Sequence, residues 1–180
     1  MPEKLDFITP TVLKVIYLFH EHTRQEFHER EVMRRAKISK GSANSILRRL
    51  AQTEVLERRR AGRMVFYRLN TRSPIARQLK VLLNIYSLGG LLKGIRPYCS
   101  RILLFGSCAE GLDVRDSDID LFVLTQEKEK VKLETSAHQR ETGRRIAAIV
   151  VNANEFARMK REDRTLYDGI AKGITLWESE

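Results

Sequence analysis

Asp118 and Asp120 are the first residues whose type and spacing indicate chemistry. Side chains of a strand alternate between its two faces, so both carboxylates are expected on one face, with their Cα atoms ~6.5–7 Å apart. Two carboxylates this close are electrostatically unfavourable unless a cation lies between them. Oxygen ligands with few protein contributions suit Mg²⁺, or Mn²⁺, which takes its remaining ligands from water and substrate phosphates. The pair therefore predicts a divalent-cation site.

Gly106 and Ser107 follow the apolar run Ile102–Phe105, which is typical of a buried strand that ends in a tight turn. Glycine lets the backbone come close to a ligand, while the Ser107 hydroxyl and the following amides are donors for phosphate oxygens. A phosphate-binding turn beside an acid pair is what metal-assisted nucleotidyl transfer requires. We therefore expect an NTP, ATP included, as substrate, with Asp118 and Asp120 as metal ligands and catalytic residues.

This stretch resembles the DNA polymerase beta-like nucleotidyltransferases, in particular the minimal nucleotidyltransferases of bacteria and archaea. The residues that match the family's pattern are Gly106, Ser107, Gly111, Ser117, Asp118, Asp120 and Leu121. The resemblance implies a small α/β domain with a mixed sheet, phosphate binding by Gly106, Ser107, Gly111 and Ser117, and transfer of NMP from an NTP to a hydroxyl on a protein or nucleic acid. Some members of the family act as antitoxins that nucleotidylate a partner toxin, so a toxin-like protein is a candidate partner.

The third carboxylate that the family usually supplies from a later strand is missing from the expected strand, Arg145–Val151. Ala147 or Ala148 stands at its position, and Glu141 and Glu155 lie outside the strand. Loss of a positioned general base typically costs about 10²–10⁴ in rate. Nucleotide binding is therefore better supported than turnover. The alternatives are a transcription regulator with a catalytically silent nucleotide sensor and an antitoxin-type protein that binds a partner.

The N-terminal part of the chain has the pattern of three helices followed by a hairpin. The helices are expected from Thr9-Pro10 onward, near Glu29–Ala36, and over Ala43–Leu50 after a turn at Ser39–Ser42; the strands are Val55–Arg60 and Met64–Leu69. This order resembles the winged helix-turn-helix of many prokaryotic transcription regulators. Together the two resemblances give an α+β fold class, with a winged helix-turn-helix ahead of the nucleotidyltransferase domain.

In a winged helix-turn-helix the third helix enters the major groove, and the wing reaches phosphate or the minor groove. Residues 1–72 hold 16 Lys/Arg against 8 Asp/Glu, whereas residues 73–180 hold 17 against 15, so most of the positive excess lies in this segment. We expect contacts to DNA, or to RNA; the alternative is a dimerisation module whose arginines are solvated. The expected contact residues are Lys40, Ser42, Asn44, Ser45, Arg48, Arg49, Arg58, Arg59, Arg60 and Arg63.

A connecting helix is expected over 73–95, starting at Ser73-Pro74 and interrupted at Gly89-Gly90. It divides the chain into a winged helix-turn-helix at 1–72 and a nucleotidyltransferase domain at 96–180. A broad apolar face of this helix indicates a core between the domains, or a contact between two copies of the chain in a homodimer. Its members are Ile75, Leu79, Leu82, Leu83, Ile85 and Tyr86.

No apolar stretch approaches the roughly 18 residues needed to span a bilayer, so no membrane contact is expected. Residues 1–8 carry acids and lack the apolar run of a secretory signal. Cys99 and Cys108 are too few for a disulfide framework or a zinc site, and Cys108 is more typical of a packed side chain than of a reactive thiol. We therefore expect a cytoplasmic location.

Overall fold

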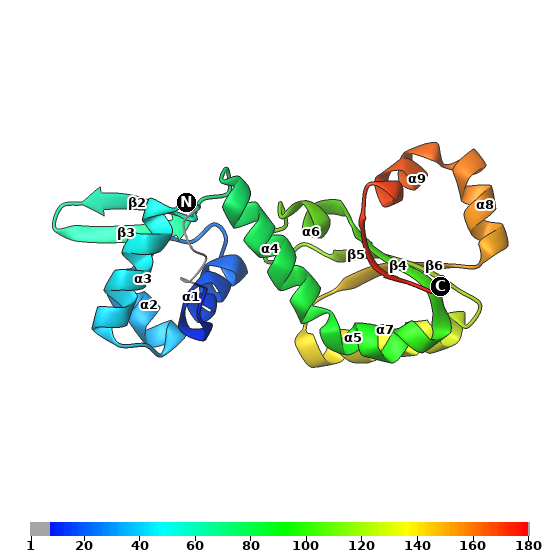
Figure 1. The fold of residues 1–180 in the computed structure, drawn as a ribbon, viewed down its shortest axis with the longest axis horizontal. Helices are drawn as coiled ribbons and strands as arrows, with labels where there is room; N and C mark the ends of the chain where they lie inside the picture. Colours follow the sequence, from blue (N-terminus) through cyan, green and yellow to red (C-terminus); the bar gives the residue numbers. More distant parts are fainter. Residues whose placement is uncertain (1–7, 180) are drawn as a thin grey trace, which may run out of the picture. The chain divides into compact units, whose positions relative to one another are not determined.

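The computed structural model describes residues 8–179 and contains two compact units that divide between Gln78 and Leu79 (Figure 1). The expectation about a secretory signal concerns residues 1–8, of which 1–7 lie outside the described range. Within that range, no helix combines the length and the apolar character required to cross a bilayer.

The first unit consists of three helices and a small antiparallel sheet in the order β1-β3-β2. Its elements are α1 (Pro10–Glu21), β1 (Phe27–His28), α2 (Glu29–Ala36), α3 (Lys40–Gln52), β2 (Leu56–Ala61) and β3 (Met64–Leu69). The predicted helices and hairpin are confirmed, except that the third helix begins at Lys40 because the Ser39 hydroxyl caps it by accepting from the Ser42 amide at 3.1 Å. The pattern does not predict β1, which is only two residues long.

The hairpin turns between Ala61 and Met64, which are paired across the two strands. Gly62 has a φ of 59°, a left-handed conformation that glycine adopts without steric cost. The strands close over a core in which Phe19 meets Phe27 edge to face, with 5.5 Å between ring centroids. Val15 and Leu50 are also fully buried there, so the unit has an apolar core of its own.

The second unit is built on a four-stranded mixed sheet in the order β6-β5-β4-β7. Its strands are β4 (Cys99–Phe105), β5 (Ile119–Thr125), β6 (Ile146–Val151) and β7 (Ile174–Glu178). Only the β5–β6 pair is parallel, and the helix α7 (Lys128–Thr142) forms its crossover. The predicted mixed sheet is confirmed.

Helices cover both faces of this sheet (Figure 1). On one face, α5 (Gly89–Ile95) and α7 pack on Leu104 of β4 and Leu121 of β5. On the other face, α8 (Ala153–Glu162) and α9 (Arg164–Ala171) pack on Leu103 and Phe122. The two remaining short elements are the 3₁₀ turn η2 (Arg96–Tyr98) and the helix α6 (Gly106–Glu110).

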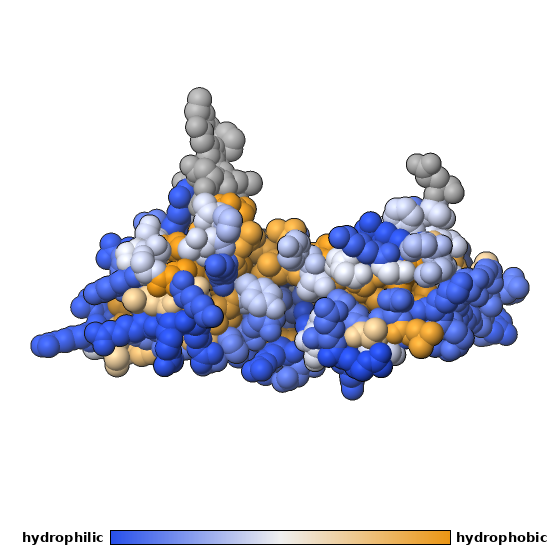
Figure 2. All heavy atoms as spheres, turned by 90° about the horizontal axis from the view of Figure 1, so that it is seen from below, coloured by the Kyte–Doolittle hydropathy of each residue, from blue (hydrophilic) through white to orange (hydrophobic). Residues whose placement is uncertain are grey.

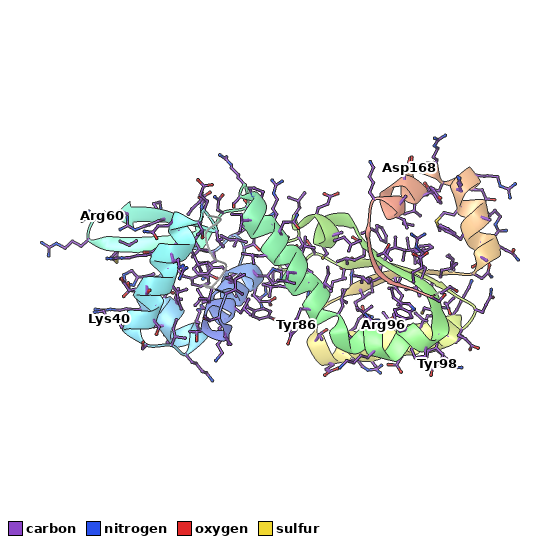
Figure 3. The ribbon with its side chains drawn as sticks, viewed as in Figure 1. Lys40, Arg60, Tyr86, Arg96, Tyr98 and Asp168 are labelled. Atoms are coloured by element: carbon purple, nitrogen blue, oxygen red, sulfur yellow. The ribbon has the colours of Figure 1, made fainter. Side chains whose placement is uncertain are left out.

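The helix α4 (Pro74–Ser87) begins at the predicted place, where the Ser73 hydroxyl accepts from the Ala76 amide at 3.4 Å, and Leu88 separates it from α5. The expectation that its apolar face is a core is wrong in part. Ile75, Leu82 and Tyr86 are exposed, Tyr86 at 83 % (Figure 3), while Leu79 is buried. Most of the face seen in Figure 2 is hydrophilic, with hydrophobic side chains in small groups.

Polar side chains share the buried positions of α4 with Ala76, Leu79 and Val81. Lys80 is 2 % exposed and Asn84 is fully buried. A pattern of apolar residues does not predict this, because burying a polar side chain is tolerated only where specific partners satisfy it. Those partners lie in the loops around the predicted phosphate turn.

Candidate functional site

The turn after β4 brings the backbone of Gly106 directly against the side chain of Asp120. Phe105, the last residue of β4, is paired with Asp120 across the antiparallel β4–β5 ladder, so the next residue meets the Asp120 carboxylate. Gly106 has a φ of 66°, and a Cβ added there would collide with that carboxylate. Both the left-handed backbone and the close approach therefore require glycine.

The two predicted acids lie at the start of β5 on the face that also carries Phe122. Asp118 is the residue before the strand and Asp120 its second residue, so strand alternation assigns both to one face. The pKa of Asp120 is raised by burial and by the negative charge of Asp118. The structure thus places two like charges side by side at the end of the Gly106 turn.

Arg145 pairs with Asp118 through both carboxylate oxygens. Its Nε lies 2.6 Å from Oδ1, and its Nη2 contacts Oδ2. This pairing, above all its hydrogen bonds, lowers the pKa of the Asp118 carboxyl. The sequence pattern does not predict it, because the two residues are far apart in the chain and only the β5–β6 register brings them together.

The register also shows which alanine of β6 lies where a third carboxylate was expected. Asp120 is paired with Ala147 across the parallel β5–β6 ladder, and the side chain of Ala147 is exposed on the same face. Ala148 packs on the opposite face. Glu155 caps α8 and binds Lys128, while Glu141 belongs to α7, so neither replaces the missing group. Ala147 is therefore the equivalent position.

The donor set fits a divalent cation that takes most of its ligands from elsewhere. In the part of the chain that the structure describes, no group of three His, Cys, Asp or Glu residues is arranged to hold a metal ion. Two carboxylates beside a glycine-lined approach suit a cation that keeps waters and arrives with phosphate oxygens. Asp118 and Asp120 are the residues that would hold it.

Gly111 and Ser117 shape the loop between α6 and β5. Gly111 ends α6 with a φ of 68°, and its amide donates to the Ser107 carbonyl. The Ser117 hydroxyl accepts from the Val114 amide at 2.9 Å, and the Ser117 amide donates to the Val114 carbonyl at 2.9 Å. Both residues therefore hold the loop that leads from the turn to the acid pair, and their predicted phosphate contacts stay a prediction.

A buried polar network behind this loop was missed by the sequence pattern. The Lys80 ammonium contacts the Asp113 backbone carbonyl and lies 3.2 Å from Asp113 Oδ1. Asn84 Nδ2 donates to Asp113 Oδ1 at 3.0 Å and to the Cys108 carbonyl at 3.1 Å. The only sequence signal is the presence of Lys80 and Asn84, four residues apart, within an otherwise apolar helix.

Arg144 and Cys108 extend the network to the acid pair. Arg144 Nη1 donates to Asn84 Oδ1 at 3.1 Å, and the Cys108 thiol donates to the backbone carbonyl of Asp118 at 3.4 Å. Burial raises the pKa of the Cys108 thiol to about 11, so the thiol stays protonated and acts as a packed side chain rather than a nucleophile. The network fixes the loop on which Asp118 sits.

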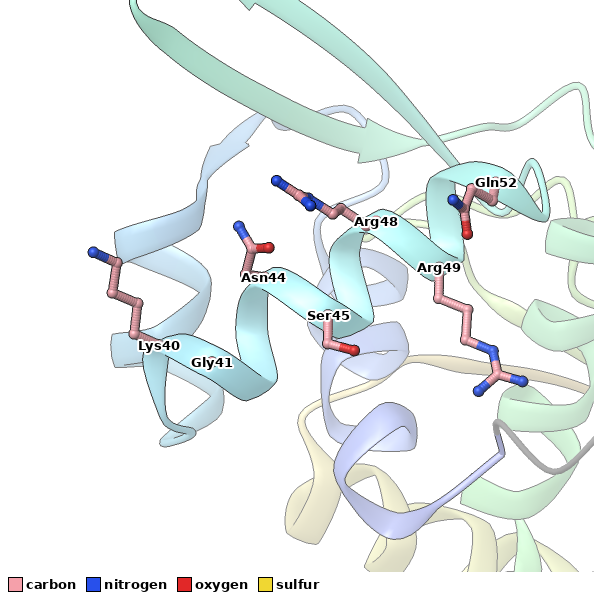
Figure 4. A pocket seen from close by; sticks show the side chains of 7 residues that line it. All are labelled: Lys40, Gly41, Asn44, Ser45, Arg48, Arg49 and Gln52. Carbon is pink, nitrogen blue, oxygen red and sulfur yellow. The ribbon is translucent and has the colours of Figure 1, made fainter.

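In the first unit, side chains of α3 line an open hollow on the surface (Figure 4). Lys40, Asn44 and Arg48 are spaced by four residues and lie along one side of the helix in that view, with Ser45 and Arg49 on another. Asn44 also donates to Glu29 of α2 at 2.8 Å. Ser42 differs from the rest, because its hydroxyl lies 2.9 Å from that of Ser39 within the helix cap.

The four arginines of the hairpin do not form one group. Alternation along β2 puts Arg58 and Arg60 on one face and Arg59 on the other. Arg59 pairs with Glu26, with its Nε 3.0 Å from Oε1, and its guanidinium carbon lies 5.3 Å from the ring centroid of Phe66. Arg60 lies near the tip of the hairpin (Figure 3), where its Nε donates to the Gly62 carbonyl at 3.2 Å, and Arg63 belongs to the turn itself. The Arg59 guanidinium is therefore already paired with a carboxylate of the same unit.

Comparisons with known proteins agree with the geometry of the second unit. The family model described as a nucleotidyltransferase domain matches residues 92–171, a range that includes the turn, the acid pair and Ala147. A solved structure described as a toxin-antitoxin with AMP-PNP is 22 % identical, covers 54 % of this chain and 75 % of that chain, and has a TM-score of 0.38. No curated protein matches the chain. The match to the nucleotidyltransferase-domain family is confined to residues 92–171.

Proposed function

We propose that the second unit binds an NTP together with Mg²⁺ or Mn²⁺ and transfers its NMP to a hydroxyl on a protein or nucleic acid. The observation that carries this proposal is the contact of the Gly106 backbone with Asp120, beside Asp118. The glycine leaves space for a ligand next to the backbone, and the two carboxylates repel each other. A cation with bound phosphates would fill the space and offset the repulsion. The family match over 92–171 supports the same reaction class.

Each residue of the site has a separate part in this proposal. Gly106 leaves room for a phosphate near the backbone, and Ser107 offers a hydroxyl as a donor. Asp118 and Asp120 hold the cation, which when bound would polarise the α-phosphate and balance its developing charge. With Ala147 in place of a third carboxylate, the acceptor hydroxyl has no positioned base from β6, and we expect slow turnover.

Calorimetric titration with each of the four NTPs, with and without Mg²⁺, tests the proposal. We expect Mg²⁺-dependent binding that disappears in Asp120→Asn and in Asp118→Asn. Asp116→Asn is the matched control, because Asp116 is an exposed acid two residues before Asp118. Binding that persists in both site variants would exclude the acid pair as the cation site.

Ala147 favours a second candidate function, a nucleotide sensor that binds an NTP without transferring it. The two candidates differ in the fate of the α-phosphate. α-³²P-labelled NTP is incubated with the protein and with lysate of the source cells. Label that becomes attached to a protein or an RNA excludes the silent sensor, whereas Mg²⁺-dependent NTP binding without any transfer supports it.

We infer that the first unit is a winged helix that binds DNA, or RNA, through α3 and the tip of the hairpin. Two features support this: the α3 surface with Lys40, Asn44 and Arg48, and the excess of positive charge in residues 1–72. Phosphate contacts make affinity fall steeply with salt concentration. Fluorescence anisotropy with duplex DNA and with RNA at several salt concentrations tests the inference; a dimer without affinity for either would favour the dimerisation module.

We further propose a protein partner for the exposed apolar side chains of α4. Leu82 and Tyr86 are spaced by four residues on one side of the helix and are both exposed. A toxin-like protein and a second copy of the chain are the two candidate partners. Light scattering after native purification separates them: a stoichiometric second protein supports the first, a homodimer supports the second, and a monomer without a bound protein contradicts both.

A further inference from the structure

The guanidinium of Arg145 engages both carboxylate oxygens of Asp118, the atoms with which Asp118 would bind a cation. We propose that Arg145 is a built-in counter-ion that prevents a divalent cation from binding alone and allows it to bind together with a triphosphate. The inference rests on the proposed nucleotide function and deepens it, because it assigns a residue that sets the conditions under which the site is filled.

The sheet itself builds this contact. The Ile119 amide donates to the Arg145 carbonyl at 2.9 Å, and Ile119 is paired with Ile146 at the start of the parallel β5–β6 ladder. Asp118 and Arg145 are therefore equivalent residues, each directly ahead of its strand, and their side chains leave the sheet on the same face. The Arg145 fork then engages both oxygens of Asp118.

The charges at the site explain the consequence for a free cation. Asp118 and Asp120 together carry two negative charges, and Arg145 returns one positive charge, while Ala147 adds none. A divalent cation without a nucleotide would have to displace Arg145 from Asp118 and would gain only two carboxylate ligands. The attraction of the site for a free ion is therefore weaker than the acid pair suggests.

Displacement is easy once a second anion is present. The Arg145 side chain is 78 % exposed, so its pair with Asp118 is a surface ion pair that water and salt screen. A guanidinium binds phosphate with the same two-pronged geometry as a carboxylate. A triphosphate at the acid pair thus offers Arg145 new acceptors as the cation takes over Asp118.

Arg145→Gln tests this role with two different ligands. We expect free Mn²⁺, titrated alone and followed by its electron paramagnetic resonance signal, to bind about five- to tenfold more tightly than in the unmodified protein. We expect the Mg²⁺ complex of the preferred NTP, titrated by calorimetry, to bind several-fold more weakly, since a phosphate partner is lost. Opposite changes for the two ligands are the signature of a counter-ion.

Two further variants serve as controls. Arg140→Gln removes the same charge from an exposed position on α7 and should change neither affinity by more than about twofold. Arg145→Lys keeps the charge without the fork and should bind Mn²⁺ nearly as the unmodified protein does. Circular dichroism verifies that each variant is folded.

Three outcomes would overturn the counter-ion role: Mn²⁺ affinity in Arg145→Gln that is unchanged, one that is lower, or an equal gain in Arg140→Gln. These results are distinct from a failure of the proposed function. If the unmodified protein binds none of the four NTPs with Mg²⁺, the nucleotide function itself falls. If it binds one of them and the Mn²⁺ titration shows no gain, only the role of Arg145 falls.

Discussion

Gly106 and Gly143 are suitable positions for a matched pair of substitutions. Both adopt a left-handed backbone, but only at Gly106 does another side chain lie where a Cβ would be. Their φ angles are 66° and 69°. A Cβ at Gly106 would meet the Asp120 carboxylate, whereas a Cβ at Gly143 would have nothing within 4 Å. Substitution by alanine should therefore strain the backbone at both positions, but should disturb the Asp120 carboxylate only at Gly106.

We expect Gly106→Ala and Gly143→Ala each to lower the free energy of unfolding by ~1–2 kcal/mol, the usual penalty for a left-handed L residue. Only Gly106→Ala should also turn the Asp120 carboxylate away and lose Mg²⁺-dependent nucleotide binding. Chemical denaturation measures the first effect and calorimetry the second. Equal nucleotide affinity in the two variants would contradict the assigned contact.

The charge of Asp120 is expected to destabilise the folded protein. Its pKa is raised above the ordinary value of 3.8 by burial and by Asp118, so folding disfavours its ionised form. This cost is fully present above the raised pKa and disappears as the pH falls below 3.8. Asp120→Asn should therefore raise the free energy of unfolding near pH ~7 and leave it unchanged near pH ~3. Denaturation at both pH values measures this, and a loss of stability near neutral pH would refute it.

At the scale of the elements, the strands and helices with a strong apolar period were predicted well. β4, β5 and β6 are apolar runs bounded by turn residues, and α2 was located at its observed ends. The helix α7 was not predicted from the sequence, because Val131 and Thr135 are its only residues that the structure describes as buried. Such a helix leaves little apolar pattern in the sequence.

The candidate site was predicted where its chemistry is local in sequence and missed where it depends on pairing. Gly106, Asp118 and Asp120 belong to one short stretch, so their spacing was sufficient. Arg145 was missed, and the choice between Ala147 and Ala148 was left open, because both depend on the β5–β6 register, which a single sequence does not specify.

The buried network gives a prediction about α4 and the loop it holds. Lys80→Met would remove the closer cation of the Asp113 carboxylate, which is also almost fully buried, and would leave only Arg144, whose Nη2 lies 4.0 Å from Asp113 Oδ2. Breaking a buried pair on one side typically costs ~3–5 kcal/mol. We expect a loss of stability of that order, measured by urea unfolding. Lys93→Met, at an exposed position on α5, should have little effect.

A double variant separates the pair from simple packing. Asp113→Asn added to Lys80→Met removes the uncompensated charge while keeping the shape of the side chain. Part of the lost stability should return. Strictly additive losses would show that the charge of Asp113 plays no part in the loss caused by Lys80→Met, which would then come from the contact of Lys80 with the Asp113 backbone carbonyl.

At the scale of the whole molecule, the uneven distribution of charge leads to a prediction about nucleic-acid binding. Arg58 and Arg60 share one face of the hairpin, while Arg59 is held by Glu26. We expect Arg58→Ala/Arg60→Ala to reduce the slope of log affinity against log salt by about one to two, one for each lost phosphate contact. Arg59→Ala should change it less. An equal effect of all three arginines would contradict this difference between the two faces of the hairpin.

The short connection between α7 and β6 contains two adjacent arginines, Arg144 and Arg145, whose side chains lie in different environments. Arg144 turns inward to Asn84, and Arg145 turns outward to Asp118. The number of residues between Gly143 and β6 thus decides which side chain points inward and which points toward Asp118. In relatives of this chain, one residue more or fewer in this connection should exchange the two orientations. A basic residue there would then contact either the buried network or the acid pair.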